Sequence, residues 1–389
     1  MPSATTSPQR NPARPDTARG ERFRVAHASG EWARAAKDCV TQLEADPAEA
    51  NLGFLYVTDA LADDLSSILT FLRERTGIED WVGTVGVGVC ATGVEYFDAP
   101  AMAVMTGNFP AGSYRVFPAI STDIQTFLDE NRDWIASARP HLGLVHADPR
   151  NPRNPDLIVE LSEATSAFLV GGLASSRRGY DQIAGSVTSG GLSGVLFSGE
   201  VAVATGLTQG CLPIGPVHTV TTGFGNVLAE LDGDEALNVL ASDAGEEVSE
   251  DLAERIANVE AAFPVAASDT GDYLVRNLIG IDVERGLLVI GERVSAGDKI
   301  LFVRRGETEA VADMSQMLSQ LHQRIGGTPK GGVYIACVGR GPAIFSPENR
   351  ELDLIRKEFG DFPLVGFSAN GEICHNRLYG YTGVLALFL

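Results

Sequence analysis

The sequence predicts a mixed α/β protein whose mixed sheets are built from repeated β-α-β-β units in two associated domains. One layout recurs in three segments: a strand after a glycine, a helix, a strand with a Val-Gly pair, and a closing strand. A chain of 389 residues also exceeds what one ordinary core holds, which favours two domains. The composition, 44% hydrophobic and 7% aromatic, fits an α/β protein.

We expect the first two strands of each recurring segment to be parallel, because a helix connects them by a right-handed crossover. The closing strand follows a shorter excursion and is expected to be antiparallel to its neighbour. The three segments comprise 52–59, 62–75, Val82-Gly83 and 101–107; 141–148, 157–167, Val170-Gly171 and 192–199; and 331–341, 348–359, Val365-Gly366 and 381–389.

The region between the second and third segments has a different pattern. Residues 199–226 alternate apolar and small polar residues and are interrupted by Gly and Pro, which predicts edge or hairpin strands. We then predict helices over 229–240 and 251–260, and a hairpin over 286–306 with its turn at 295–298. A further helix over 309–324 is expected to place its core-facing side chains, Met314, Met317, Leu318 and Leu321, on one face.

Charge and cysteine usage narrow the functional classes. The net charge is −21, and arginines gather only in a Pro-, Ser- and Ala-rich tail over residues 1–24, which is expected to be disordered. Nucleic-acid binding is therefore not expected. No stretch approaches the roughly 18 apolar residues of a membrane span, so membrane insertion is not expected either. Five cysteines without a CxxC pair indicate a reducing, cytoplasmic location, and the scattered histidines predict no metal site.

The richest candidate site lies at the end of the strand in the third segment. The apolar run from residue 333 ends in Cys337, Gly339, Arg340 and Gly341. The neighbouring strand ends in Asn370, Gly371 and Glu372. The carboxyl ends of parallel strands share one edge, where crevices form.

These residue types suit a small ligand. Arg340 would clamp a carboxylate, Glu372 would accept an ammonium, and Asn370 would offer a donor and an acceptor. The glycines would let backbone amides approach the ligand. The alternative interpretation is structural: Arg340 and Glu372 pair with each other and hold two strand ends together.

Two further hypotheses concern other chemistry. Cys337 beside an arginine could be a thiolate nucleophile with His375 or His218 as its base, which would make the protein an enzyme. His218 could instead be an axial ligand of a haem cofactor. Neither hypothesis has a supporting signature in the sequence, so we expect a binding protein without a bound cofactor.

Four phrases, taken together and in this order, resemble the FIST family: QGCLPIG from residue 209, VTTGFGNVLAELDGDEAL from 220, CVGRGPAIF from 337 and GFSANGEI from 366. The resemblance implies a FIST N domain over 25–235 and a FIST C domain over 236–389. It also implies a sensory protein that binds a small ligand, such as an amino acid or small acid, and signals to a separate partner protein. Some members resemble haem-dependent gas sensors. The first Val-Gly segment here lacks the Ser-Thr-x-Gly-Glu turn that many relatives carry.

Overall fold

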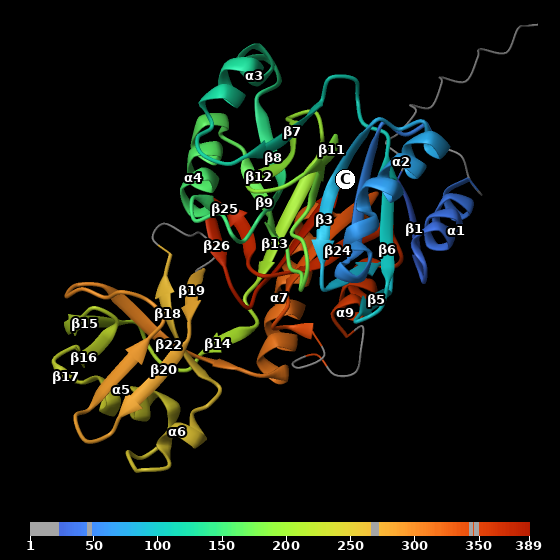
Figure 1. The fold of residues 1–389 in the computed structure, drawn as a ribbon. Coiled ribbons are helices and arrows are strands. Elements are labelled where there is room, and N and C mark those ends of the chain that lie inside the picture. The colour runs from blue at the N-terminus through green and yellow to red at the C-terminus, as the bar shows by residue number, and fades with distance from the viewer. Residues whose placement is uncertain (1–22, 45–48, 266–271, 342–344, 346–349) are drawn as a thin grey trace, which may run out of the picture.

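The computed structural model describes residues 23–44, 49–265, 272–341, 345 and 350–389. Within these ranges the strands form four sheets, of which three have six strands and one has nine (Figure 1). The predicted tail over residues 1–22 lies outside the described residues. Its last two predicted members, Phe23 and Arg24, instead begin β1, where Phe23 packs against Phe109 and Phe388.

The three six-stranded sheets are built by three units with the same chain path. Each unit has an edge strand, a helix, a central strand, a second helix, a strand parallel to the central one, a hairpin and a closing strand. Unit 1 consists of β1 (Phe23–Ser29), α1 (Trp32–Glu44), β2 (Leu52–Thr58), η1 (Asp59–Asp64), α2 (Leu65–Thr76), β3 (Asp80–Gly86), β4 (Gly88–Ala91), β5 (Val94–Phe97) and β6 (Ala101–Gly107). Unit 2 consists of β7 (Tyr114–Ile120), α3 (Gln125–Ala138), β8 (Pro140–Ala147), α4 (Asn154–Thr165), β9 (Phe168–Leu173), β10 (Gln182–Ala184), β11 (Ser186–Thr188) and β12 (Leu192–Ser198). Unit 3 consists of β13 (Val203–Thr208), α7 (Glu307–Ile325), β23 (Gly331–Cys337), α9 (Arg350–Phe359), β24 (Leu364–Ala369), β25 (Glu372–His375), β26 (Arg377–Tyr379) and β27 (Gly383–Phe388).

Each unit places its hairpin in the sheet of another unit. The β4–β5 hairpin pairs with β24 of unit 3, β10–β11 pairs with β3 of unit 1, and β25–β26 pairs with β9 of unit 2. The sheet orders are therefore β1-β6-β2-β3-β10-β11, β7-β12-β8-β9-β25-β26 and β13-β27-β23-β24-β4-β5. The three exchanges are cyclic: each unit adds its hairpin to the sheet of a second unit and receives the hairpin of the third.

The predicted fold class of mixed α/β is confirmed, and so is the strand pairing within the repeat. The parallel pairs are β2–β3, β8–β9 and β23–β24. The closing strands β6, β12 and β27 run antiparallel to β2, β8 and β23. The sequence analysis did not anticipate that the repeat begins one strand and one helix earlier, or that its hairpin leaves for another sheet.

The Val-Gly pairs have a steric reason. A Cβ at Gly83, Gly171 or Gly366 would collide with a backbone oxygen of the parallel central strand, at Leu55, Val145 and Tyr334 respectively. Only glycine lets the two strands lie this close at the centre of each sheet.

Each sheet has a face toward a shared core and a face covered by its own helices. The shared core takes side chains from all three units, among them Phe54, Leu144 and Ile335. On the outer faces, separate cores form under α1 and α2, under α3 and α4, and under α7 and α9. The three units thus make one body, which we call the three-sheet body.

The fourth sheet belongs to a segment inserted in unit 3 between β13 and α7, which we call the inserted domain (residues 211–305). Its pairings are all antiparallel, and its apolar core is separate (Figure 1). Its elements are β14 (Cys211–Pro213), β15 (His218–Phe224), β16 (Val227–Leu231), β17 (Asp234–Glu235), α5 (Ala236–Ala244), α6 (Leu252–Arg255), β18 (Val259–Pro264), β19 (Tyr273–Arg276), β20 (Leu278–Asp282), β21 (Leu287–Ile290) and β22 (Lys299–Arg305).

Three element predictions for this region need correction. The helix predicted over 229–240 starts only at Ala236, because residues before it pair as β16 between β15 and β21. The helix predicted over 251–260 is limited to α6, since the alanine-rich residues after it lie between β19 and β22 as β18. The predicted hairpin over 286–306 is wrong as well, because two strands separate β21 from β22. Tertiary pairing overrides local preference in all three cases.

The helix predicted over 309–324 is confirmed as α7. Met314, Met317, Leu318 and Leu321 are buried on its core face, and Gly326 ends it with φ 64°. The five cysteines are free and buried. In the described part of the chain, no helix is long and apolar enough to cross a membrane. The predicted domain boundary at residue 235 stays a prediction.

Candidate functional site

Arg340, the predicted carboxylate clamp, is fully buried and already holds a carboxylate. Its Nε and Nη2 donate to Glu351 Oε1 at 3.0 and 2.7 Å, and Nη1 donates to the Tyr381 carbonyl. Burial alone would lower the pKa of Arg340, but the Glu351 carboxylate offsets this and raises it. The charged guanidinium therefore links the end of β23 to α9 through an ion pair. It is not accessible to a ligand.

Glu372 is also fully buried, and it does not pair with Arg340. Its Oε2 accepts from the amide and hydroxyl of Thr382 at 3.1 and 2.7 Å. Burial raises the pKa of Glu372 to about 8 and that of the Cys337 thiol to about 11. Cys337 is thus a protonated thiol at neutral pH, which does not favour the role of a nucleophile.

The remaining predicted residues shape the same region. Asn370 is exposed, and its Nδ2 donates to the Ala174 carbonyl of unit 2. The Gly371 carbonyl accepts from Leu173, and the Gly339 carbonyl accepts from Arg305. Cys337 and Gly341 border a cavity of about 20 Å³, which is room for about one water. The structure therefore brings the predicted residues together around tight internal contacts, and the ligand role predicted for them stays a prediction.

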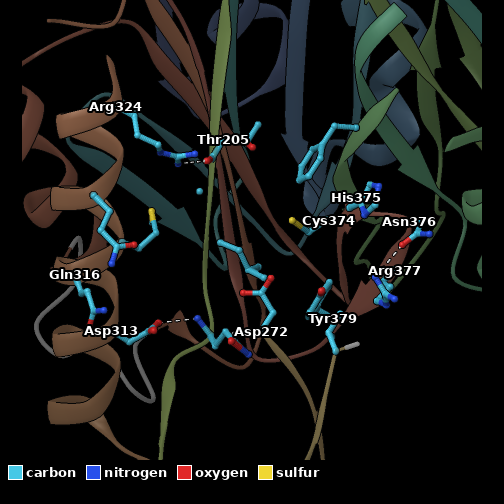
Figure 2. A pocket seen from close by; sticks show the side chains of 17 residues that line it. Thr205, Asp272, Asp313, Gln316, Arg324, Cys374, His375, Asn376, Arg377 and Tyr379 are labelled. Carbon is cyan, nitrogen blue, oxygen red and sulfur yellow. Dashed lines mark hydrogen bonds between the residues drawn. The ribbon is translucent and has the colours of Figure 1, made fainter. Parts of the chain in front are cut away.

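A larger pocket of about 570 Å³ lies elsewhere in unit 3 (Figure 2). Its walls come from β13, α7, the β25–β26 hairpin, the start of β9 and the β18–β19 region of the inserted domain. The residues that line it are Phe168, Thr205, Gly206, Leu207, Gln209, Val265, Asp272, Asp313, Gln316, Met317, Gln320, Arg324, Cys374, His375, Asn376, Arg377 and Tyr379.

Two arginines give the pocket its electrostatic character. Arg324 on α7 donates to the Thr205 carbonyl, and Arg377 on β26 donates to Asn376 Oδ1. Neither arginine forms a salt bridge with a carboxylate of the described residues. The acidic wall is different, because Asp313 Oδ2 already accepts from Thr208 Oγ1 and from the amides of Gln209 and Gly210. Asp272 lines the pocket as well, so its walls carry two acidic and two basic side chains in a chain whose net charge is −21. The two guanidinium groups are the positively charged donors that these walls offer to an anion.

The far wall of the pocket is aromatic and apolar. His375 has a positive φ of 57° and stacks on Phe168 with ring centroids 5.2 Å apart. Cys374 and Tyr379 lie beside it on the same hairpin. Guanidinium groups, amides and flat rings together suit a small anion with a polar and an apolar part.

The pocket occupies one of three equivalent seams, where the edge strand of one sheet faces the hairpin of the next sheet. At the first seam, β1 meets β5, and His27 Nδ1 lies 2.6 Å from the Tyr96 hydroxyl. At the second, β7 lies against β10 and β11, and the Tyr114 hydroxyl donates to Asp80 across the seam. At the third, the pocket separates β13 from β25–β26. The third seam differs from the other two in its side chains and in the inserted domain, which follows β13 and contributes Val265 and Asp272 to the wall of the pocket.

His218, the predicted haem ligand, lies in the inserted domain and does not border either of these two cavities. Its Nδ1 is 2.7 Å from Asp232 Oδ2 and its Nε2 is 2.9 Å from Asp243 Oδ2. Burial lowers its pKa, but the two carboxylates outweigh this and raise it. An axial ligand needs a ring nitrogen with an available lone pair, so this geometry does not favour the haem hypothesis.

The sequence analysis missed most of the residues that line the pocket. Gln209 stood in one of the family phrases and His375 was named as a possible base for Cys337, but Arg324, Arg377 and Asp313 carried no signal of their own. Their proximity depends on the exchange of the β25–β26 hairpin into the sheet of unit 2, which the local pattern does not reveal.

Comparison with known proteins agrees with the resemblance found in the sequence. The FIST N domain matches residues 51–234 and the FIST C domain matches residues 236–375. Uncharacterized protein Rv0628c of Mycobacterium tuberculosis is 30% identical over 354 residues, covering 87% of this chain and 90% of the relative. Uncharacterized protein Mb0898c of Mycobacterium bovis is 30% identical over 356 residues, covering 87% of this chain and 89% of the relative. The chain therefore belongs to the FIST family, with a FIST N domain followed by a FIST C domain.

Proposed function

We propose that this protein is a sensory protein that binds a small acidic ligand, such as an amino acid, in the pocket between β13 and β25–β26. FIST domains are associated with sensory and signalling proteins, which favours a binding role over catalysis. The observation that carries the proposal is the pocket of about 570 Å³ with Arg324 and Arg377 lining it, neither in a salt bridge with a carboxylate of the described chain.

The two arginines supply the recognition. A guanidinium presents a planar fork of donors that matches a carboxylate, and it stays charged at any physiological pH. Arg324 comes from the last turn of α7 and Arg377 from the exchanged hairpin, so one ligand that reaches both would connect α7 of unit 3 with the sheet of unit 2 (Figure 2). Gln209, Gln316 and Gln320 add amide donors and acceptors that fix the orientation of a polar ligand.

The ligand-bound state would be signalled to a separate partner protein.

The proposed pocket replaces the ligand site predicted at Arg340, whose guanidinium is already bound to Glu351. The haem and enzyme hypotheses are not carried further, because the nitrogens of His218 are both occupied and Cys337 is a thiol at neutral pH.

Isothermal titration calorimetry with the twenty amino acids and with small di- and tricarboxylic acids tests the proposal. We expect at least one acid to bind and Arg377→Ala or Arg324→Ala to weaken it. A charge-assisted hydrogen bond contributes about 1.5–3 kcal/mol, so the dissociation constant should rise roughly 10- to 100-fold.

Arg132→Ala is the matched control, because Arg132 on α3 is exposed and pairs with Asp129 one helical turn away. Its ligand affinity should equal that of the unmodified protein. The proposal fails if no acid in the panel binds, or if the three arginine variants bind with the same affinity.

A further inference from the structure

The inserted domain is attached to the three-sheet body by two short crossings, and the first of them borders the pocket. The first crossing follows Thr208 at the end of β13 and leads to β14, and the second leads from Arg305 at the end of β22 to α7. The inserted domain has its own apolar core, and its apolar contacts with the body include Leu274 against the shared core and Tyr381 against a second cluster of the inserted domain. A displacement of the inserted domain has to rearrange these contacts but leaves the interior of each core intact.

Residues of the pocket fix the first crossing. Asp313 Oδ2 accepts from the Thr208 hydroxyl and from the amides of Gln209 and Gly210 at 2.6 and 3.1 Å. The Gln209 side chain donates to the Tyr273 carbonyl of the inserted domain at 2.8 Å. Asp313 and Gln209 both line the pocket, so a ligand that hydrogen-bonds to either one competes with the contacts that orient the crossing.

The second crossing rests on Tyr381 and Arg340. Arg305 stacks 3.9 Å above the Tyr381 ring and donates to the Gly339 carbonyl at 2.7 Å. The Tyr381 hydroxyl donates to Asn277 of the inserted domain, and its carbonyl accepts from Arg340. Tyr381 has a φ of 64°, an unfavourable conformation for a residue with a bulky side chain.

The pocket also has walls on both sides of this junction. Val265 and Asp272 belong to the inserted domain, whereas Arg324 and Arg377 belong to the body. A ligand that touches both sides binds one separation of the two parts more tightly than others, and it therefore shifts the population toward that separation.

We propose that the ligand in this pocket sets the position of the inserted domain relative to the three-sheet body, and that this displacement is the signal a partner reads. The inference rests on the proposed function for its ligand. One part of the inference, that the contacts of Asp313 and Gln209 with the first crossing hold the inserted domain in position, needs no ligand. We call it the mechanical part, and it can be tested on the protein alone.

The experiment measures the separation of the two parts by double electron–electron resonance in the full chain. Spin labels are placed on Ser67→Cys in α2 and Ile279→Cys in β20, both exposed, while the native cysteines are buried. Asp313→Ala removes the acceptor of the first crossing and should shift the mean distance by more than about 2 Å or broaden its distribution. Asp353→Ala, an exposed acid on α9, should leave the distance unchanged.

L-glutamate is the ligand probe, because it carries two carboxylates and an ammonium. Saturating L-glutamate should shift the distance in the unmodified protein and not in Arg377→Ala at the same concentration. If calorimetry shows that L-glutamate binds but the distance does not change, the inference is overturned while the proposed function stands.

If no acid of the calorimetric panel binds, the proposed function fails. The mechanical part is then tested by itself, by comparing the distance between the spin labels in Asp313→Ala with that in the unmodified protein. An unchanged distance in Asp313→Ala overturns that part. Gln209→Ala is the second variant if Asp313→Ala loses its circular dichroism signal, and the same criterion applies to it.

Discussion

The first and third seams of the three-sheet body join the same kinds of strands, an edge strand and an exchanged hairpin, but the first is closed and the third contains a pocket. At the first seam, His27 and Tyr96 meet directly and close the gap between β1 and β5. At the third seam, β13 and β25–β26 are separated by a pocket of about 570 Å³. The repeated fold thus provides three seams of the same kind, and the side chains at each seam, together with the inserted domain beside the third, decide which one stays open.

The predictions below test this comparison and are ordered by their expected effect on the free energy of unfolding. The largest effect is expected for the feature that all three units share, the close approach of the two parallel strands at the centre of each sheet. In Gly366→Ala, the new Cβ would collide with the Tyr334 carbonyl oxygen, and backbone cannot yield as a flexible side chain does. We expect a loss above about 4 kcal/mol, measured by urea denaturation.

Gly199→Ala is the control for that variant, since a Cβ there meets no atom within 4 Å. Equal stability of the two variants would show that the Val-Gly pairs are not required for strand packing. The steric explanation given for these pairs in all three units would then be wrong.

The second prediction concerns the buried ion pair between Glu351 and Arg340, the residue that was predicted from the sequence to clamp a ligand carboxylate. Glu351→Gln leaves the Arg340 guanidinium buried without its carboxylate and should lower the free energy of unfolding by about 3–5 kcal/mol. Asp129→Asn, at an exposed pair, should change it by less than about 1 kcal/mol. In the folded fraction of Glu351→Gln, calorimetry should still show ligand binding at the third seam. Loss of binding with the fold intact would return the ligand site to Arg340.

The third prediction follows from Glu372. Burial raises its pKa from 4.5 to about 8 in the folded protein. Because the folded pKa lies above the unfolded one, the stability it contributes is fully present below pH about 4.5 and is lost as the pH rises through about 8. Each pKa unit corresponds to about 1.4 kcal/mol, so the change is on the order of a few kcal/mol.

Urea denaturation between pH 5 and 9 measures this dependence, and Glu372→Gln should flatten it. His218 acts in the same direction, because its folded pKa is also raised and its contribution is lost as the pH rises through that pKa. A slope that is identical in Glu372→Gln and the unmodified protein would contradict the assignment to Glu372.

The fourth prediction opens the closed seam. His27→Ala removes the hydrogen bond to Tyr96 and should lower the free energy of unfolding by about 1 kcal/mol. Thermal unfolding measures it, and ligand affinity at the third seam should not change. A change in affinity would mean that the seams are energetically coupled.

The fifth prediction closes the open seam. Thr205→Trp would fill the pocket from β13 with a residue type that strands accept, so the free energy of unfolding should change by only about 0.5 kcal/mol. Calorimetry should show that ligand binding is abolished. Retained binding at the original affinity would place the ligand elsewhere.

The fold was predictable from the sequence wherever the signal was local. The Val-Gly pairs and the apolar strands predicted the three parallel pairs, and the spacing of Met314, Met317 and Leu321 predicted the buried face of α7. Residues 229–231 of β16 and 259–260 of β18 were assigned to helices because their propensity is ambiguous and their strand partners lie far along the chain.

The candidate site was less predictable for the same reason. Arg340 and Glu372 do lie near each other at strand ends, but Glu351, eleven positions beyond Arg340, binds the guanidinium first. Arg324 and Arg377 meet at one pocket only because a hairpin crosses to another sheet. A sequence pattern records which residues are suited to bind, and it does not record which of them already have a partner.

The exchange of hairpins has a consequence for the order of events during synthesis. The β4–β5 hairpin belongs to a sheet whose other strands follow much later, as the bond between Thr92 and the Phe362 carbonyl, 270 positions apart, illustrates. At a translation rate of about 5–20 residues per second, the ribosome needs roughly 15 to 55 s to supply that partner. During this interval the edge of β4 that later pairs with β24 is unpaired and exposed. The nascent chain is therefore most vulnerable to aggregation before its last segment emerges.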